Sequence, residues 1–185
     1  MMPIRDTIAG TYSGTGYSHR KAVAMVELTR EQVADYLYRC YTAVDGLWCM
    51  KVEEKYGFDV ALDIDNEVWK VFPKIQARKL KELTGLGNGL EALYDCLTIK
   101  MTLEKYSFKA EKLENGGGFR LTIDGCHWHD MMVGSGREHL SAKVGSTICA
   151  TEFSGWAAEF GDDIRFEQVC RLCEGAPTCV VQFSK

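Results

Sequence analysis

The sequence predicts an α+β protein: a helical N-terminal half, then antiparallel β-hairpins packed around a late helix. Two observations predict this class. Apolar residues recur at three-four spacing over residues 29–83, which is typical of amphipathic helices. From residue 107 onward, two stretches alternate apolar and polar residues around glycine-containing turns, which is typical of β-hairpins. The length of 185 residues is enough to bury one core.

The first 24 residues are rich in Gly, Ser and Thr and show no periodicity, so we expect residues 1–24 to form a flexible tail. Residues 25–185 are then a single domain. Thr29 and Gln32 have the spacing of a capping box, which predicts that the first helix begins there. This first helix is expected to end at Gly57. Its apolar positions predict one buried stripe, which consists of Val33, Leu37, Cys40, Val44, Leu47 and Trp48.

A second helical pattern runs from Val60 to Leu83. Pro73 is expected to kink this helix, because proline removes an internal hydrogen-bond donor. A glycine cluster at residues 85–89 predicts a turn. The next segment, residues 90–106, fits a helix or a strand, and we predict a helix that runs into an extended piece. The basic run at residues 78–81 is expected to lie on a solvated helix face.

In the C-terminal half the spacing of the apolar residues changes three times, between the period of a strand and that of a helix. Residues 107–125 predict a first hairpin, and residues 137–160 return to helical spacing. Residues 163–184 predict a second hairpin, with its connection at residues 174–178. Because hairpins bury one face, we expect the two to form one antiparallel sheet that brackets the late helix.

The charge balance limits the partners. The chain has 22 Lys and Arg against 26 Asp and Glu, a net charge of −4, and no long basic run. Nucleic acid is therefore not the expected partner. No apolar stretch approaches the ~20 residues that span a bilayer, and no signal-peptide core follows the N-terminus. We therefore expect a cytoplasmic protein without membrane contact, whose partner is a small molecule; a homodimer remains open.

Eight cysteines are the most unusual feature of the composition. In a chain without a signal peptide, they favour metal binding or thiol chemistry over disulfides. Cys40, Cys49 and Cys96 stand in apolar, periodic surroundings, so we expect them in the core. The other five cysteines lie within residues 126–179, together with three histidines. This second group is the candidate chemical site.

The candidate metal ligands come from three separate segments: Cys126, His129, Cys149, Cys173 and Cys179. Thiolate and imidazole suit zinc, and a zinc site takes four ligands, or three and a water. Cys170 is disfavoured as a ligand, because strand positions three apart point to opposite faces. His127 is a weaker candidate that would share one side of an extended segment with His129, and His139 is expected in solvent. The alternatives are a haem or iron–sulfur centre and thiols that only pack in the core.

The late helix places a carboxyl group beside a thiol. Cys149, Glu152 and Phe153 share a face by three-four spacing, and Trp156 continues that face. If this face lines a pocket, Glu152 is the candidate general acid or base, with Cys149 as ligand or nucleophile. Trp156, like Trp128, is expected in the core or in the pocket wall.

Several motifs resemble a prokaryotic Cys-rich family over residues 25–185. They are Cys126-His-Trp-His129, Gly136-Arg-Glu-His-Leu140, Cys149-Ala-Thr-Glu-Phe153 and Cys173-Glu-Gly-Ala-Pro-Thr-Cys179, together with the helical stretch Val26–Leu83. That family is similar to the L-2-amino-thiazoline-4-carboxylic acid hydrolase-like proteins. The C-terminal hairpin is similar to small-molecule-binding domains of the vinyl-reductase type, in which cysteines around such a turn hold zinc.

The resemblance implies a cytoplasmic protein with a Cys-lined pocket, and two functions follow from it. The first is a metal-dependent hydrolase of a small cyclic amidine, in which zinc activates water and Glu152 moves protons. The second is a module that binds or senses a small molecule, in which zinc only ties the hairpin to the late helix.

Overall fold

The fold is described from a computed structural model, which describes residues 27–114 and 116–185. The predicted tail, residues 1–24, lies outside the described residues. The chain divides into two compact units, residues 1–37 and residues 38–185, and the boundary falls inside the first helix. In the part of the chain that is described, no helix combines the length and the apolar character that a membrane crossing requires.

The first helix begins where the capping box predicts. Helix α1 spans Arg30–Tyr56. The Thr29 amide donates to Gln32 Oε1 at 2.9 Å, and the Gln32 amide donates to Thr29 Oγ1 at 3.1 Å. The prediction of a buried stripe is wrong, because α1 contains no buried residue. Cys40 is exposed, so its predicted place in the core is also wrong.

Residues 58–84 form two helices where the sequence predicts one kinked helix. Helix α2 spans Phe58–Trp69 and helix α3 spans Phe72–Thr84. Pro73 lies in the first turn of α3, where its missing N–H has no helical partner to lose. Proline therefore starts a new helix here. Helix α4 follows at Leu90–Leu103, which confirms the predicted helix, but residues 104–106 form a turn and not an extended piece.

Residues 108–184 contain a four-stranded antiparallel sheet, in the order β1-β2-β4-β3. This sheet confirms both predicted hairpins, and it confirms the prediction that they form one antiparallel sheet. Strand β2 pairs with β4 in a register that places Ile123 opposite Cys179. The pairing of β3 with β4 is irregular between Gln168 and Cys170. The strands are β1 (Phe108–Lys112), β2 (Gly118–Ile123), β3 (Arg165–Cys170) and β4 (Cys179–Ser184).

The predicted late helix is continuous but contains a π-helical turn. It consists of α6 (Glu138–Val144), the π-helical turn η1 (Gly145–Cys149) and α7 (Ala150–Phe160). Wide turns of this kind recur at functional sites. Two shorter elements complete the chain, helix α5 (His127–Gly134) after β2 and the 3-10 turn η2 (Leu172–Glu174) between β3 and β4.

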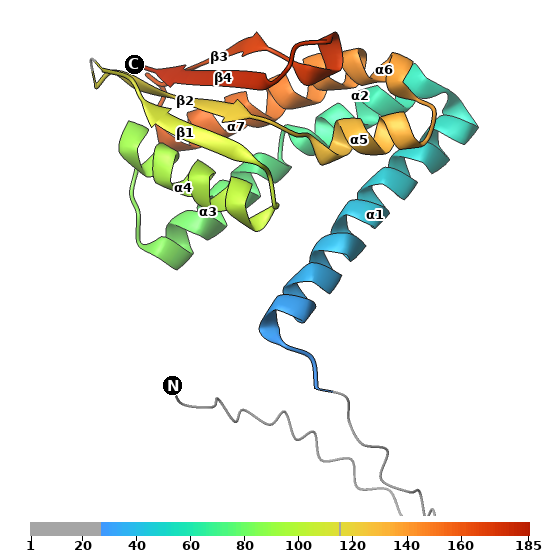
Figure 1. The fold of residues 1–185 in the computed structure, drawn as a ribbon, viewed down its shortest axis with the longest axis horizontal. Helices are drawn as coiled ribbons and strands as arrows, with labels where there is room; N and C mark the ends of the chain where they lie inside the picture. Colours follow the sequence, from blue (N-terminus) through green and yellow to red (C-terminus); the bar gives the residue numbers. More distant parts are fainter. Residues whose placement is uncertain (1–26, 115) are drawn as a thin grey trace, which may run out of the picture. The chain divides into compact units, whose positions relative to one another are not determined.

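The core lies between the sheet and the helices α3, α4 and α7, which Figure 1 shows on one side of the strands. Its centre is aromatic: Trp156 stacks on Phe160, and Phe119 stacks on Phe183. Cys96 is fully buried here, as predicted. The largest fully buried side chains in this region are Trp156, Phe119, Phe160, Phe183, Leu93, Leu97, Met101, Leu121 and Val181. This core fixes one rigid wall of the site.

Candidate functional site

A cavity of about 440 Å³ lies beside the core, within residues 38–185. Its walls come from α1, α2, α4, α5, the late helix and the sheet. The volume falls in the range of about 300–1,000 Å³ that small-molecule sites occupy. Most of the lining is aromatic or aliphatic: Phe58, Leu62, Trp69, Met101, Ile123, Trp128, Met131, Met132, Ile148, Phe153 and Val181.

The structure brings the predicted thiols to this one cavity. Cys126 caps α5, Cys149 ends η1, Cys173 lies in η2 and Cys179 begins β4, and all four line the cavity. Cys49 of α1 lines it too, so this cysteine is at the cavity wall where the sequence predicts core. The cavity therefore has a wall of sulfur atoms drawn from four distant segments, which the order of the sequence does not reveal.

These thiols are neutral at neutral pH. Burial raises the pKa of Cys149 far above its usual range, and the Glu152 carboxylate adds to the rise. Burial also raises the pKa of Cys126 and brings the pKa of Cys179 to about 11. Because the thiolate is the nucleophile and the metal ligand, the thiol wall in this state is an apolar, polarisable surface.

The arrangement of the described residues does not fit a metal ion as it stands. No group of three or more His, Cys, Asp and Glu side chains among them could hold one. His129 lies on α5, where its Nδ1 is 2.7 Å from Ser141 Oγ. Cys170 does not line the cavity, and its thiol donates to the Thr178 carbonyl at 3.3 Å. Zinc and the alternative iron centre remain predictions.

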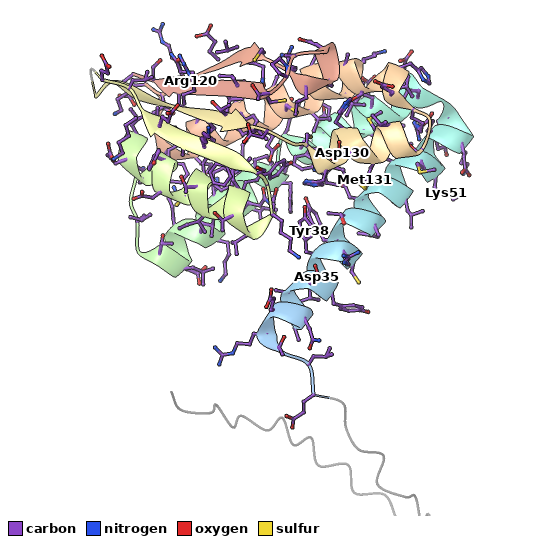
Figure 2. The ribbon with its side chains drawn as sticks, viewed as in Figure 1. Asp35, Tyr38, Lys51, Arg120, Asp130 and Met131 are labelled. Atoms are coloured by element: carbon purple, nitrogen blue, oxygen red, sulfur yellow. The ribbon has the colours of Figure 1, made fainter. Side chains whose placement is uncertain are left out.

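The two histidines of the Cys-His-Trp-His motif lie on different sides of a helix. The sequence predicts an extended segment with both on one side, but residues 127–134 form α5, where positions two apart diverge by about 200°. His127 Nε2 is 3.0 Å from the hydroxyl of Tyr38, which Figure 2 labels on α1. His127 thus joins α5 to α1, while His129 faces the cavity. His139 is exposed, as predicted.

A buried ion cluster forms the polar part of the cavity wall. Lys100 of α4 is only 4% exposed, and its Nζ lies 2.5 Å from Glu152 Oε1 and 3.0 Å from Glu104 Oε2. The Lys100 ammonium also lies over the Tyr106 ring, 5.6 Å from its centroid. Glu152 and Lys100 both line the cavity. The face of the late helix that carries Glu152 is therefore turned inward, as its spacing predicts.

The pKa values in this cluster are set by burial and by the position of one cation between two carboxyl groups. Burial alone would lower the pKa of Lys100, but Glu152 and Glu104 outweigh it and raise that pKa above its usual range. Burial raises the pKa of Glu152, and Lys100 opposes the rise without cancelling it. Lys100 therefore stays charged, and Glu152 takes up a proton more readily than an exposed glutamate.

A second acidic pair lines the cavity at α1 and α2. Asp45 and Asp65 both line it, next to Trp69. Burial raises the pKa of Asp65 to about 6, the charge of Asp45 adds to this rise, and a hydrogen bond from Trp69 opposes it. Burial also raises the pKa of Asp45. At a pH above these raised pKa values the two carboxyl groups are charged, and their charges lower the free energy of unfolding.

We expect Asp65→Asn to stabilise the protein at pH 7.5. The folded-state pKa of Asp65, about 6, is above the unfolded value, so its charge costs stability above pH 6 and costs none below about pH 4. After allowance for solvent screening of this half-buried group, the gain is about 1 kcal/mol at pH 7.5. Urea unfolding at pH 7.5 and pH 4 measures it. Asp63→Asn, at an exposed position of the same helix, is the control, and an equal gain at pH 4 would contradict the assignment.

Two polar atoms of cavity-lining residues have no hydrogen-bond partner among the described residues. They are Gln168 Oε1 and Arg171 Nε. Both side chains are fixed by other bonds: Gln168 Nε2 donates to the Cys170 carbonyl at 2.8 Å, and an Arg171 terminal N–H donates to Glu174 at 2.7 Å. Both atoms are inaccessible to solvent, so each leaves a hydrogen-bonding capacity unused at a cost in stability.

Several of these site residues are missing from the sequence prediction. Asp45, Asp65, Gln168 and Arg171 carry no local signal, because single polar residues among apolar ones are also what the solvated face of an amphipathic helix or strand presents. Lys100 does carry one, since it interrupts the apolar run Leu97–Met101. A lysine at such a position is buried only when it is paired.

Comparison with protein families gives a match over residues 24–178 to DUF6125, a family of unknown function. The chain belongs to this family. The match contains the cavity-lining residues from α1 to η2 and ends just before β4. No curated protein and no solved structure matches the chain.

Proposed function

We propose that the protein binds a small, mainly apolar molecule in the thiol-walled cavity. The observation that carries this proposal is the 440 Å³ cavity itself, whose lining is largely apolar and contains a few convergent polar groups. Small-molecule sites have this composition, in which apolar walls supply affinity and a few polar groups orient the ligand. The ion pair of Lys100 and Glu152 in the cavity wall supports a ligand that has one polar end.

The free state of all eight cysteines supports a reducing compartment, and we include a cytoplasmic location in the proposal. Neutral thiols line the cavity without charge, which supports an apolar ligand rather than a phosphorylated one. The same arrangement serves a binding module or a sensor.

The test is binding of an anilinonaphthalene sulfonate fluorophore, used as an apolar probe with one polar end. Met132→Trp enlarges a half-buried cavity-lining side chain on α5 and should weaken probe binding about tenfold, because the added ring occupies the site. Leu103→Trp adds the same indole at an exposed position outside the cavity and should leave binding unchanged. Equal affinities in all three proteins would count against the cavity as the site.

A second candidate function, hydrolysis of a small cyclic amidine, is favoured by Glu152. A buried carboxyl group with a raised pKa in a cavity is the usual form of a general acid or base. In this proposal Glu152 moves the proton, and Lys100, 2.5 Å away, keeps the carboxylate oriented.

The test of this second candidate is the hydrolysis of 2-amino-thiazoline-4-carboxylate by the wild type, Glu152→Gln and Leu103→Trp. Chromatography measures the loss of the substrate. Glu152→Gln should lower turnover at least 100-fold, while Leu103→Trp retains it. Elemental analysis of each preparation tests the zinc and iron predictions at the same time. Probe binding without turnover would leave the binding module as the function.

A further inference from the structure

Helix α1 is apolar on two sides, and only one of them faces the cavity. Asp45 and Cys49 point to the cavity side. At about 100° per residue, Val44, Leu47 and Trp48 lie on the opposite side, and their side chains are 64%, 56% and 60% exposed. These three residues are the α1 stripe. Val33 and Leu37 continue the same spacing along the sequence and are also exposed.

Helices α2 and α3 repeat this two-sided pattern. Phe58, Leu62 and Trp69 of α2 line the cavity. The other side of α2 carries Val60, Ile64 and Val68, which are 44%, 39% and 46% exposed. Two further residues, Val71 and Ile75, are exposed at the turn and on α3. These five exposed residues are the α2–α3 stripe.

We infer that the α1 stripe and the α2–α3 stripe form the interface of a homodimer. Together the eight half-exposed side chains offer on the order of 600–800 Å² of apolar surface, close to the roughly 800 Å² that each partner contributes to a stable interface. Single exposed apolar residues need no explanation, but two stripes that together have this area mark an interaction surface.

The spacing of the stripe indicates what covers it. Val33, Leu37, Cys40, Val44 and Leu47 follow alternating steps of four and three residues, which is the repeat of a helix that packs along another helix. A second copy of this chain supplies such a helix at equal concentration, and a two-fold axis lets each copy bury the same surface.

The charges beside the α2–α3 stripe favour a second copy over a lipid surface. Exposed acidic residues flank it on α2, at Asp59, Asp63 and Glu67, and basic residues follow on α3, at the half-buried Lys74 and the exposed Lys79. Helices that lie on membranes carry lysine and arginine on their polar face. An antiparallel pair of copies instead brings the acidic α2 of one toward the basic α3 of the other.

The test is sedimentation velocity of the full chain between 1 and 100 µM. We expect a species of twice the 20.8 kDa chain mass. Leu47→Glu places a charge in the α1 stripe and should weaken association by about 30-fold or more. Val169→Glu is the matched control, because Val169 is a 52% exposed apolar residue on β3, outside both stripes.

The side chain of Leu47 is exposed in the single chain, so Leu47→Glu should keep the helical circular dichroism spectrum of the parent. A wild-type protein that stays monomeric at 100 µM would overturn the inference. A Leu47→Glu protein that still dimerises would overturn it too. Flotation with phosphatidylcholine and phosphatidylglycerol vesicles adds a third outcome: a monomer that binds the vesicles through the stripe would replace the second copy with a membrane.

Discussion

Lys100→Met should lower the free energy of unfolding by about 3–5 kcal/mol, because it removes one partner of a buried ion cluster. The substitution leaves Glu152 and Glu104 without the ammonium group that lies 2.5 Å and 3.0 Å from them. Methionine replaces the lysine stem as far as Cε and lacks only the ammonium group, so the lost charge accounts for most of the effect. Urea unfolding at pH 7.5, followed by circular dichroism, measures it.

The pH dependence of this variant identifies the cause. The folded-state pKa of Lys100 is raised, so its stabilising contribution is complete below the unfolded pKa of about 10.4 and is lost only as the pH rises through the folded value. The deficit of the variant should therefore not change between neutral pH and about pH 9. It should shrink in acid, where Glu152, whose pKa burial raises, takes up a proton.

Lys79→Met is the control for Lys100→Met. Lys79 pairs with Glu82 at 2.9 Å on the surface of α3, and exposed pairs of this kind contribute about 0–1 kcal/mol. A loss for Lys100→Met as small as that of the control would mean that water, not Lys100, neutralises the cluster.

Gly118→Ala should destabilise the protein by about 3 kcal/mol, because it overpacks the pairing of two central strands. A Cβ atom at Gly118 would overlap the Phe183 carbonyl oxygen and lie 2.8 Å from Leu113 Cδ1. The carbonyl belongs to the backbone of β4 and cannot rotate away, so β2 and β4 must separate. The same pairing carries Ile123 and Cys179 to the cavity wall, and probe binding should weaken in parallel with stability.

Gly125→Ala is the matched control for Gly118→Ala. A Cβ atom at Gly125 would meet nothing within 4 Å, and the backbone there is not in the left-handed region. The expected change is within about 0.5 kcal/mol. Similar losses for both variants in chemical denaturation would show that the close approach of β4 is not the cause.

Local patterns determined the elements of this protein. The Thr29–Gln32 capping box, the two hairpins and the late helix are all found where the sequence predicts them, because caps, turns and periodicity depend on residues near one another in the chain. The inward turn of Glu152 is also local, since three-four spacing ties it to the buried Phe153 and Trp156.

Contacts between distant residues decided which helix faces are buried. The spacing of Val44 and Leu47 is that of a buried stripe, yet the structure exposes them and turns Asp45 and Cys49 to the cavity. When a helix has apolar residues on two sides, the pattern of apolar residues is compatible with burial of either side. The choice depends on the distant residues that contact α1, such as His127 beside Tyr38 and Phe72 beside Tyr41, and periodicity holds no information on them.

The sequence by itself determined the α+β class, the two hairpins, the late helix and the candidate group of Cys126, Cys149, Cys173 and Cys179. Only the tertiary structure decided that Lys100, Asp65, Gln168 and Arg171 join them. The physical reason is that ion pairing and burial depend on which residues lie close together in the folded chain, and these residues are far apart in the sequence. Lys100 and Glu152 are 52 positions apart, and each has an unusual pKa only because the fold buries them against each other.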